Sequence, residues 1–181
     1  MTPIHITLYG GAFNKIPVRT DDFDTWPELA DALEDLVSRE YPDKLSMLAF
    51  SPHRLVDPER PKRERPYHML ENVAHVTALA IDVDKLEPAA LEGLAERVEA
   101  CGEALMYETS SSTPEAPRVR IVAPIVKPHA VSECRRFRFA FAELLGLAPG
   151  CGVEGAIDAS KIFFAGRLIG TPARRVWRYG G

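Results

Sequence analysis

The sequence predicts an α+β fold in which a βαββαβ unit of the RRM-like type follows a small N-terminal αβ module. Two observations support this prediction. From residue 73 onward, apolar periodicities alternate in the order strand, helix, strand, strand, helix, strand. Before residue 73, a strand, a helix and a second short strand precede a loop that is rich in proline. We therefore expect two sequence modules, residues 1–72 and 73–181, that pack as one unit.

The N-terminal module contains one strongly signalled helix. Thr25 is a suitable N-cap, a proline and a glutamate follow in the first turn, and apolar residues then recur at helical spacing to about Arg39. Strands are expected at Ile4–Tyr9 and Lys44–Ser51. Residues 52–66 hold four prolines and five basic residues, so we expect a basic loop there.

The second module carries the βαββαβ pattern. Its expected strands are Val76–Val83, Glu103–Thr109, Arg118–Val126 and Ile162–Ile169, and its expected helices are Pro88–Ala100 and His129–Leu147. In this fold class the strands stand in the order four, one, three, two, and neighbours are antiparallel. The end of the first strand, the turn after the second and the start of the fourth then share one edge of the sheet.

Acidic residues occupy two of those three places. Asp82 and Asp84 are two residues apart at a strand end, so both side chains are expected on one face of the sheet. Carboxylates this close repel each other unless a cation lies between them, and hard oxygen ligands favour Mg²⁺ or Mn²⁺. Asp158 would supply a third carboxylate, and three acids can hold two metal ions for displacement at phosphorus. An Asp-x-Asp at a strand end is also common as a simple polar turn.

The turn between the second and third strands is rich in hydroxyl groups. Ser110 and Ser112 lie in it, and such serines either bond their own backbone or hold phosphate oxygens. Arg118 and Arg120 alternate with apolar residues and therefore face one side of the third strand. Two interpretations stay open for this pair, ion pairing with the nearby carboxylates and binding of a triphosphate.

Together these motifs resemble the primase-polymerase domains of the archaeo-eukaryotic primase superfamily, of the type found in phage and plasmid replication proteins. That family shows an Asp-x-Asp motif, then Ser-x-His, then a hydrophobic residue followed by Asp. It often carries a turn such as Ser-His-Thr-Pro-Glu followed by Pro-Arg-x-Arg. The counterparts here are Asp82-Val83-Asp84, the segment Thr109–Arg120, and Asp158 with the following Ser160-Lys161-Ile162-Phe163-Phe164. The resemblance covers roughly residues 73–168.

The resemblance implies an RRM-like catalytic palm packed on the N-terminal module, with the active site between them. It implies a template-dependent nucleotidyltransferase, a DNA primase or DNA polymerase in plasmid or phage replication, that uses NTP or dNTP and two metal ions. Asp82, Asp84 and Asp158 would be catalytic and bind Mg²⁺ or Mn²⁺, and basic residues of the later motifs would contact the nucleotide. Ser110 matches the motif serine, but Ser112 stands where the family has histidine. Lys161 is a candidate to compensate, as are the two arginines of the third strand.

Nucleic-acid contacts are expected from local patches. The net charge is -4, so the chain lacks an overall basic footprint. The best candidates for the backbone of a single-stranded DNA template lie in the proline-rich loop: Arg60, Lys62, Arg63 and Arg65. Trp177, among basic residues near the end of the sequence, is a weaker candidate for base stacking. Solvated surface charge is the ordinary explanation for such clusters.

The composition excludes several classes of protein. Three cysteines without CxxC spacing argue against a zinc ribbon or disulfide framework and favour a reducing cytoplasm. Neither a signal peptide nor an apolar run of membrane-spanning length is found, so no membrane partner is expected.

Two other functions remain open. Ser112 favours a catalytically weak relative that binds DNA or nucleotide in replication initiation. An unrelated RRM-like binding module is disfavoured, because its central strands would carry several stacking aromatic residues. A helicase domain or subunit is a possible partner, since the ending Tyr179-Gly180-Gly181 would suit a fragment of a longer replication protein.

Overall fold

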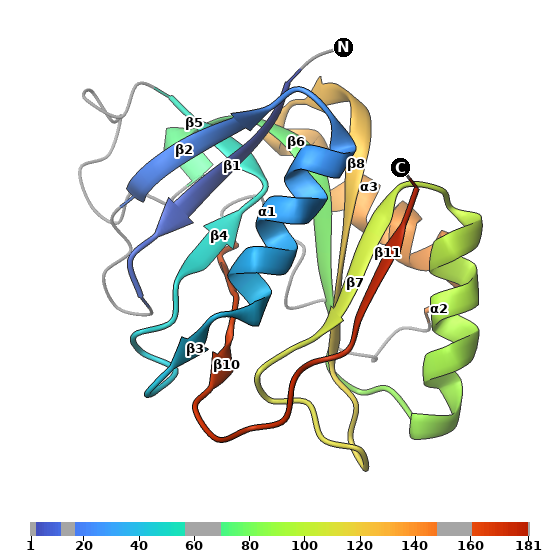
Figure 1. Cartoon of the computed structure of the whole chain (residues 1–181). Helices are drawn as coiled ribbons and strands as arrows, with labels where there is room; N and C mark the ends of the chain where they lie inside the picture. Colours follow the sequence, from blue (N-terminus) through green and yellow to red (C-terminus); the bar gives the residue numbers. More distant parts are fainter. Residues whose placement is uncertain (1–2, 12–16, 57–69, 148–160, 181) are drawn as a thin grey trace.

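The computed structural model describes residues 3–11, 17–56, 70–147 and 161–180. Most of these residues form two antiparallel sheets and three α-helices (Figure 1). The helices are α1 (Trp26–Ser38), α2 (Leu91–Ala100) and α3 (Val131–Leu144), with short 3-10 turns at Leu70–Asn72 and Pro88–Ala90. The strands are β1 (Ile4–Tyr9), β2 (Pro17–Phe23), β3 (Glu40–Tyr41), β4 (Ala49–Ser51), β5 (His53–Leu55), β6 (Val73–Val83), β7 (Ala104–Glu108), β8 (Val119–His129), β9 (Phe163–Phe164), β10 (Arg167–Leu168) and β11 (Val176–Tyr179). One sheet has the order β2-β1-β4-β9 and the other β11-β7-β8-β6-β5, and β3 pairs with β10 separately.

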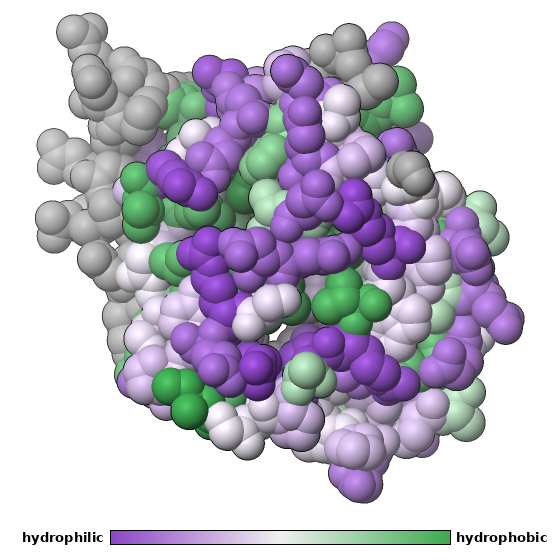
Figure 2. Space-filling model, in the orientation of Figure 1, coloured by the Kyte–Doolittle hydropathy of each residue, from purple (hydrophilic) through white to green (hydrophobic). Residues whose placement is uncertain are grey.

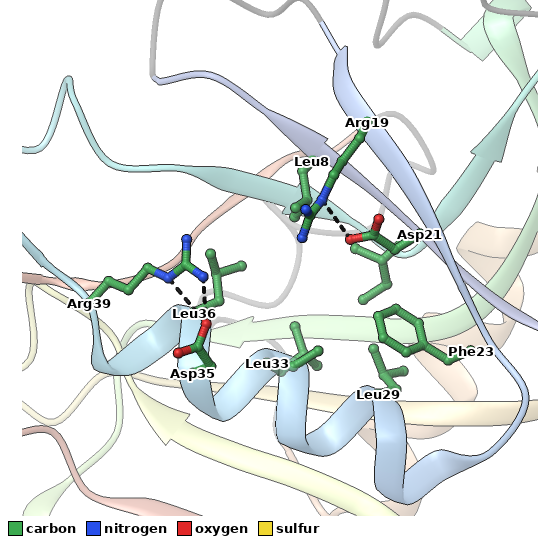
Figure 3. Close-up of a pocket in the computed structure, with 11 residues that line it drawn as sticks. Leu8, Arg19, Asp21, Phe23, Leu29, Leu33, Asp35, Leu36 and Arg39 are labelled. Atoms are coloured by element: carbon green, nitrogen blue, oxygen red, sulfur yellow. Dashed lines mark hydrogen bonds and ion pairs between the residues drawn. The ribbon is translucent and has the colours of Figure 1, made fainter.

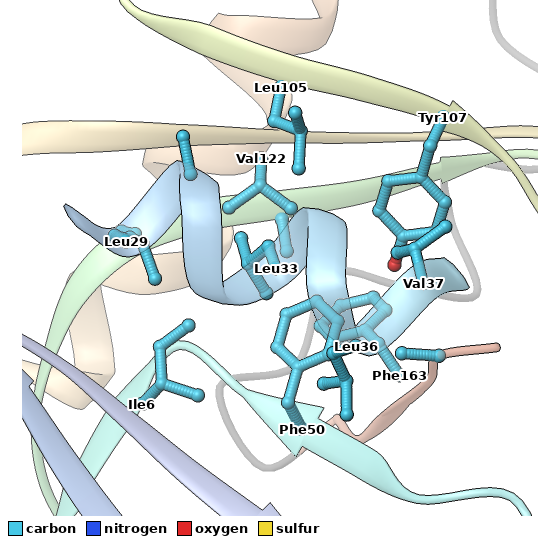
Figure 4. Packing of buried hydrophobic residues seen from close by; sticks show 14 of the residues in the cluster. Ile6, Leu29, Leu33, Leu36, Val37, Phe50, Leu105, Tyr107, Val122 and Phe163 are labelled. Atoms are coloured by element: carbon cyan, nitrogen blue, oxygen red, sulfur yellow. The ribbon is translucent and has the colours of Figure 1, made fainter. Parts of the chain in front are cut away.

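Helix α1 begins where its sequence predicts. The Thr25 hydroxyl accepts a hydrogen bond from the backbone N–H of Glu28, and the Glu28 carboxylate accepts one from the backbone N–H of Thr25, which forms a capping box. The apolar stripe of the helix, which includes Leu29, Leu33 and Leu36, is buried. Figure 4 shows this stripe between Ile6 and Phe50 of the four-stranded sheet and Leu105 and Val122 of the five-stranded sheet. Helix α1 therefore joins the two sheets through one core.

The two faces of β6 are buried against different partners. Ala78 and Ala80 belong to the core around α1, whereas Leu79, Ile81 and Val83 belong to a second core with α2 and α3. Because side chains alternate along a strand, Asp82 lies on the α1 face. The carboxylate at the end of β6 thus points toward the N-terminal part of the chain.

The expected α+β class is confirmed, and part of the expected strand order is found. Strand β8 lies between β6 and β7 and is antiparallel to both, so β6, α2 and β7 form a split βαβ unit. The expected fourth strand, Ile162–Ile169, is wrong. That segment forms β9, which pairs with β4 in the other sheet, and β10, which pairs with β3. The edge next to β6 is occupied by β5, and β11 lies at the opposite edge beside β7.

A glycine explains why the expected fourth strand is broken. Gly166, between β9 and β10, has a φ of +124°, which side-chain-bearing residues rarely adopt. A Cβ at this position would lie 2.5 Å from the Tyr41 ring, so the chain here also needs the missing side chain for close packing. After this bend, β10 pairs with β3, and the neighbours of β6 are β5 and β8.

Each of the sequence modules 1–72 and 73–181 contributes one strand to the sheet that the other module mainly forms. Strand β5 comes from the first module and joins the five-stranded sheet, whereas β9 comes from the second and joins the four-stranded sheet. The Trp26 indole also donates a hydrogen bond to the Tyr179 carbonyl at 3.1 Å.

The face shown in Figure 2 is mostly hydrophilic, with apolar residues in small separate areas. Across the described ranges, no helix is long and apolar enough to cross a membrane.

Candidate functional site

A polar cavity of about 250 Å³ is lined by the end of β6, the start of β8 and residues 161–164. Six residues that the sequence singles out line it: Asp82, Asp84, Ser110, Arg118, Arg120 and Lys161. The remaining lining residues are Lys44, Thr109, Ser111, Ile162 and Phe164. The cavity therefore gathers residues from both sequence modules and from separate strands and turns. The side chains of Asp82 and Asp84 share it, as their spacing predicts.

Arg120 is held inside the protein by Asp82. The two residues are directly opposite in the β6–β8 pairing, and the Arg120 Nε donates to the Asp82 Oδ1 at 2.6 Å. The Arg120 Nη1 donates to the Tyr107 hydroxyl at 3.0 Å and also to the Phe164 carbonyl. Burial acts to lower the pKa of Arg120, but the neighbouring Asp82 carboxylate outweighs it, so the pKa is raised and the guanidinium stays charged.

Through these contacts, Arg120 stabilises the packing of neighbouring strands. Its side chain is 7% exposed, and it connects the five-stranded sheet to the backbone of β9. Burial raises the pKa of the adjacent Tyr107, which keeps its phenol protonated. Of the two interpretations left open for the arginine pair, ion pairing with a carboxylate therefore describes Arg120. Arg120 also lines the cavity, and its Nη2 makes no hydrogen bond to any described residue.

Arg118 differs from Arg120 in exposure and partners. It is exposed, lines the same cavity and has no acidic partner among the described residues. The same holds for Lys161, which is half-buried, and for Lys44, which is exposed. The lining carries four positive and two negative groups, which leaves a surplus of two positive charges. Three cations around one small cavity, none of them paired with an acid of the described chain, favour a ligand with several negative charges.

The two carboxylates fit a hard divalent cation. Asp82 uses Oδ1 for Arg120 and leaves Oδ2 without a hydrogen bond to a described residue, and Asp84 is exposed. Mg²⁺ is commonly held by one or two carboxylates together with phosphate oxygens of a substrate. No cluster of three or more acidic, histidine or cysteine side chains suited to a metal occurs within the described ranges. Asp158, the expected third ligand, lies outside those ranges.

The hydroxyl-rich turn uses Ser112 for its own structure. The Ser112 residue is 6% exposed, and its hydroxyl accepts a hydrogen bond from the backbone N–H of Arg118 at 3.0 Å. Arg174 donates to the backbone carbonyls of Ser110 and Ser112 at 3.1 and 3.0 Å, which fixes the turn from outside. Ser110 lines the cavity and Ser112 does not. The nucleotide-binding role expected for Ser112 stays a prediction, and the described geometry gives its hydroxyl another partner.

A buried chain of hydrogen bonds supports Lys161. The Ser51 hydroxyl donates to the Lys161 carbonyl at 2.7 Å, so its oxygen accepts from the His53 Nδ1 at 2.8 Å. The His53 Nε2 lies 2.9 Å from the Tyr9 hydroxyl, and burial raises the pKa of Tyr9. Sequence patterns do not reveal this chain, because its members are spread over three strands and the cavity.

The predicted DNA-binding residues stand in two different situations. Arg60, Lys62, Arg63 and Arg65 lie outside the described residues, so their role stays a prediction. Trp177 is half-buried on β11 opposite Met106, and it packs on the core formed with α2 and α3. That core is on the opposite face of the sheet from Asp82, and the Arg175 guanidinium lies 5.1 Å from the Trp177 ring centroid. The stacking role of Trp177 remains a prediction.

A second hollow, of about 80 Å³, lies between α1 and the face of β1 and β2 (Figure 3). Its floor is apolar, with Leu8, Phe23 and Leu33 among its residues. Its charged rim is paired internally, Arg19 with Asp21 at 2.9 Å and Arg39 with Asp35 at 2.5 Å. With its charges neutralised in this way, it offers less chemistry than the polar cavity.

Comparison with known proteins supports a fold assignment. No protein-family model matches the sequence, and no curated protein matches it. Among solved structures, the chain is similar to the AEP domain of the cyanophage S-2L primase-polymerase, with a TM-score of 0.50 and 11% sequence identity. The match covers 99% of this chain and 82% of that one. The α+β arrangement described above is therefore shared with a phage primase-polymerase domain.

Proposed function

We propose that this chain is a primase-polymerase of the archaeo-eukaryotic superfamily, a nucleotidyltransferase that adds nucleotides from NTP or dNTP to a growing strand on a single-stranded DNA template. One observation carries the proposal. In a fold shared with a phage primase-polymerase domain, a single cavity combines two strand-end carboxylates with three cations that have no acidic partner among the described residues. This combination suits a metal-bound triphosphate, because the carboxylates can bind the metal and the cations can bind phosphate oxygens.

The basic residues and the hydroxyl-rich turn would bind the triphosphate. Arg118, directly before β8, offers a planar fork of donors, and Lys161, directly before Ile162, offers a point charge. Thr109, Ser110 and Ser111 also line the cavity and supply hydroxyl donors. Most of the catalytic effect in phosphoryl transfer comes from such positioning and charge stabilisation, so these contacts would serve both binding and rate.

Asp82 and Asp84 would hold Mg²⁺ or Mn²⁺, with Asp158 as the proposed third ligand. A metal ion bound there would neutralise charge on the phosphates and activate the attacking hydroxyl of the primer end. The role of Arg120 is to fix the position of Asp82, since its Nε donates to Oδ1 at 2.6 Å and Oδ2 makes no hydrogen bond to a described residue. The pair is largely buried, because the Arg120 and Asp82 side chains are 7% and 14% exposed.

The template and the cellular setting are part of the same proposal. The basic residues of the 60–65 segment are proposed to contact the template backbone, where each lost phosphate contact would lower the salt dependence of single-strand binding by about 0.7. A reducing cytoplasm is proposed because the three cysteines of the sequence show no CxxC spacing and are odd in number.

Primer extension tests the proposed function. The chain is incubated with Mn²⁺ or Mg²⁺, labelled nucleotides and a primed single-stranded template, and with the same template lacking a primer. We expect metal-dependent incorporation that follows the template sequence. Absence of incorporation with every combination of metal and nucleotide would reject the enzymatic proposal.

A catalytically weak nucleotide-binding module is the second candidate. The observation that favours it is the use of Ser112 for the backbone of the turn, because the family motif has a histidine at this position. The same assay separates the two functions. Metal-dependent nucleotide binding without incorporation would support the second candidate.

A further inference from the structure

One cation of the cavity comes from the N-terminal module. Lys44 lies in the turn before β4, and the sequence alone assigns it only to a short strand. In the structure it lines the same cavity as Arg118 and the hydroxyl-rich turn, which belong to the second module. The positively charged lining thus has contributions from both modules.

The turn that carries Lys44 is held by its own hydrogen bonds. The Asp43 carboxylate accepts from the backbone N–H groups of Leu45 and Ser46 at 2.9 and 2.8 Å, and the Ser46 hydroxyl donates to the Asp43 carbonyl at 2.9 Å. The bond from Ser46 is the main cause of the lowered pKa of Asp43, which keeps this carboxylate ionised. Gly11, with a φ of +85°, packs on the turn so closely that a Cβ there would lie 2.5 Å from the Leu45 carbonyl oxygen.

The Lys44 ammonium rests on an aromatic ring. Its Nζ lies 5.8 Å from the ring centroid of Phe164, a cation–π arrangement of modest strength for an exposed lysine. The backbone carbonyl of Phe164 accepts from Arg120, which binds Asp82. Lys44 therefore lies beside Phe164, which Arg120 links to Asp82. Lys44 has no acidic partner among the described residues.

We propose that Lys44, which the N-terminal module supplies, binds the triphosphate of the incoming nucleotide together with Arg118, so that residues of both modules hold the phosphates. This inference rests on the proposed function, because it names a further residue of the same site. The ligand class is a polyphosphate. A phosphate of the template or primer strand has the same chemistry, and the experiment below distinguishes the two sources.

The test measures binding of inorganic tripolyphosphate and of a dNTP, each with Mg²⁺, by isothermal titration of the full chain. Lys44→Gln is compared with wild type and with Lys127→Gln, an exposed lysine of β8 that does not line the cavity. We expect Lys44→Gln to bind both ligands about tenfold more weakly, the value of one charge-assisted hydrogen bond, and Lys127→Gln to bind like wild type. Lys44→Arg should recover most of the affinity, because it restores the positive charge. Thermal melting should be unchanged, since Lys44 is exposed and outside any ion pair of the described chain.

Three results would overturn the inference. One is equal tripolyphosphate affinity in Lys44→Gln and wild type, and another is no binding to wild type at all. The third is weaker binding of a primed template by Lys44→Gln with unchanged tripolyphosphate binding, which would assign the lysine to the strand. Failure of the proposed function looks different. There, tripolyphosphate binding would depend on Lys44 while no nucleotide is ever incorporated.

Discussion

Replacement of Asp82 by alanine should destabilise the protein, even without any metal. From the sequence alone, removal of one of two close carboxylates is expected to relieve repulsion. The structure reverses this expectation, because the Arg120 guanidinium already lies against Asp82 at 2.6 Å. Loss of the carboxylate would leave a buried positive charge without its partner.

The magnitude follows from the burial and the remaining contacts of Arg120. The two side chains are 7% and 14% exposed, and removal of one partner of a buried pair costs about 3–5 kcal/mol. Arg120 keeps the Tyr107 hydroxyl, the Phe164 carbonyl and a ring contact of 4.8 Å with Phe163, so we expect the lower limit, about 3 kcal/mol. For a chain of this size, that loss lowers Tm by about 6–12 °C.

Thermal and denaturant unfolding of four proteins would measure this effect. These are wild type, Asp82→Ala, Arg120→Met and the double variant, all in EDTA so that metal binding plays no part. The double variant removes both charges, so the coupling energy should be about 2–3 kcal/mol. Asp82→Asn keeps a hydrogen-bond acceptor and should lose only about 1–2 kcal/mol. A coupling energy near zero, or a Tm of Asp82→Ala within about 2 °C of wild type, would refute the reasoning.

The remaining predictions concern the acid at the cavity mouth, the turn and a histidine. Asp84→Asn should abolish metal-dependent nucleotide addition and leave Tm unchanged, because Asp84 is exposed; wild-type extension rates would exclude a metal role for it. Ser112→His should lower stability by about 1–3 kcal/mol, because the site is buried and its hydroxyl is bonded to Arg118; an equally stable variant that binds dNTP more tightly would contradict this. Burial, with help from the nearby His5 and Arg54, lowers the pKa of His75, so the unfolded chain binds its proton more readily. The free energy of unfolding should therefore decrease as pH falls below about 6.5. His75→Phe should flatten this part of the pH profile when it is measured by urea unfolding.

Local patterns in the sequence predict much of the site. The spacing of Asp82 and Asp84 places both carboxylates at one cavity because a strand alternates its faces, and the capping pattern at Thr25 predicts the start of α1. The β6–β8 pairing, which places Arg120 opposite Asp82, follows from the expected order of the first three strands of the second module.

Other features depend on tertiary contacts that no local pattern encodes. Residues 162–164 are apolar and aromatic, which suits a strand in either sheet, so the sequence does not reveal that β9 pairs with β4. The position of Lys44 depends on that pairing, because it brings Phe164 beside the turn. Alternation along β8 predicts that Arg118 and Arg120 share a face, but only the depth of each side chain separates a buried ion pair from an exposed phosphate ligand.

We propose that the polar cavity binds the metal-bound nucleotide through the carboxylates of Asp82 and Asp84. The most direct test is a crystal of the chain grown with Mn²⁺ and a non-hydrolysable dNTP analogue, measured for the anomalous scattering of manganese. We predict a manganese peak in direct contact with the carboxylates of Asp82 and Asp84, and triphosphate density beside Arg118 and Lys161. Nucleotide density at another site, or manganese that contacts neither carboxylate, would contradict the account.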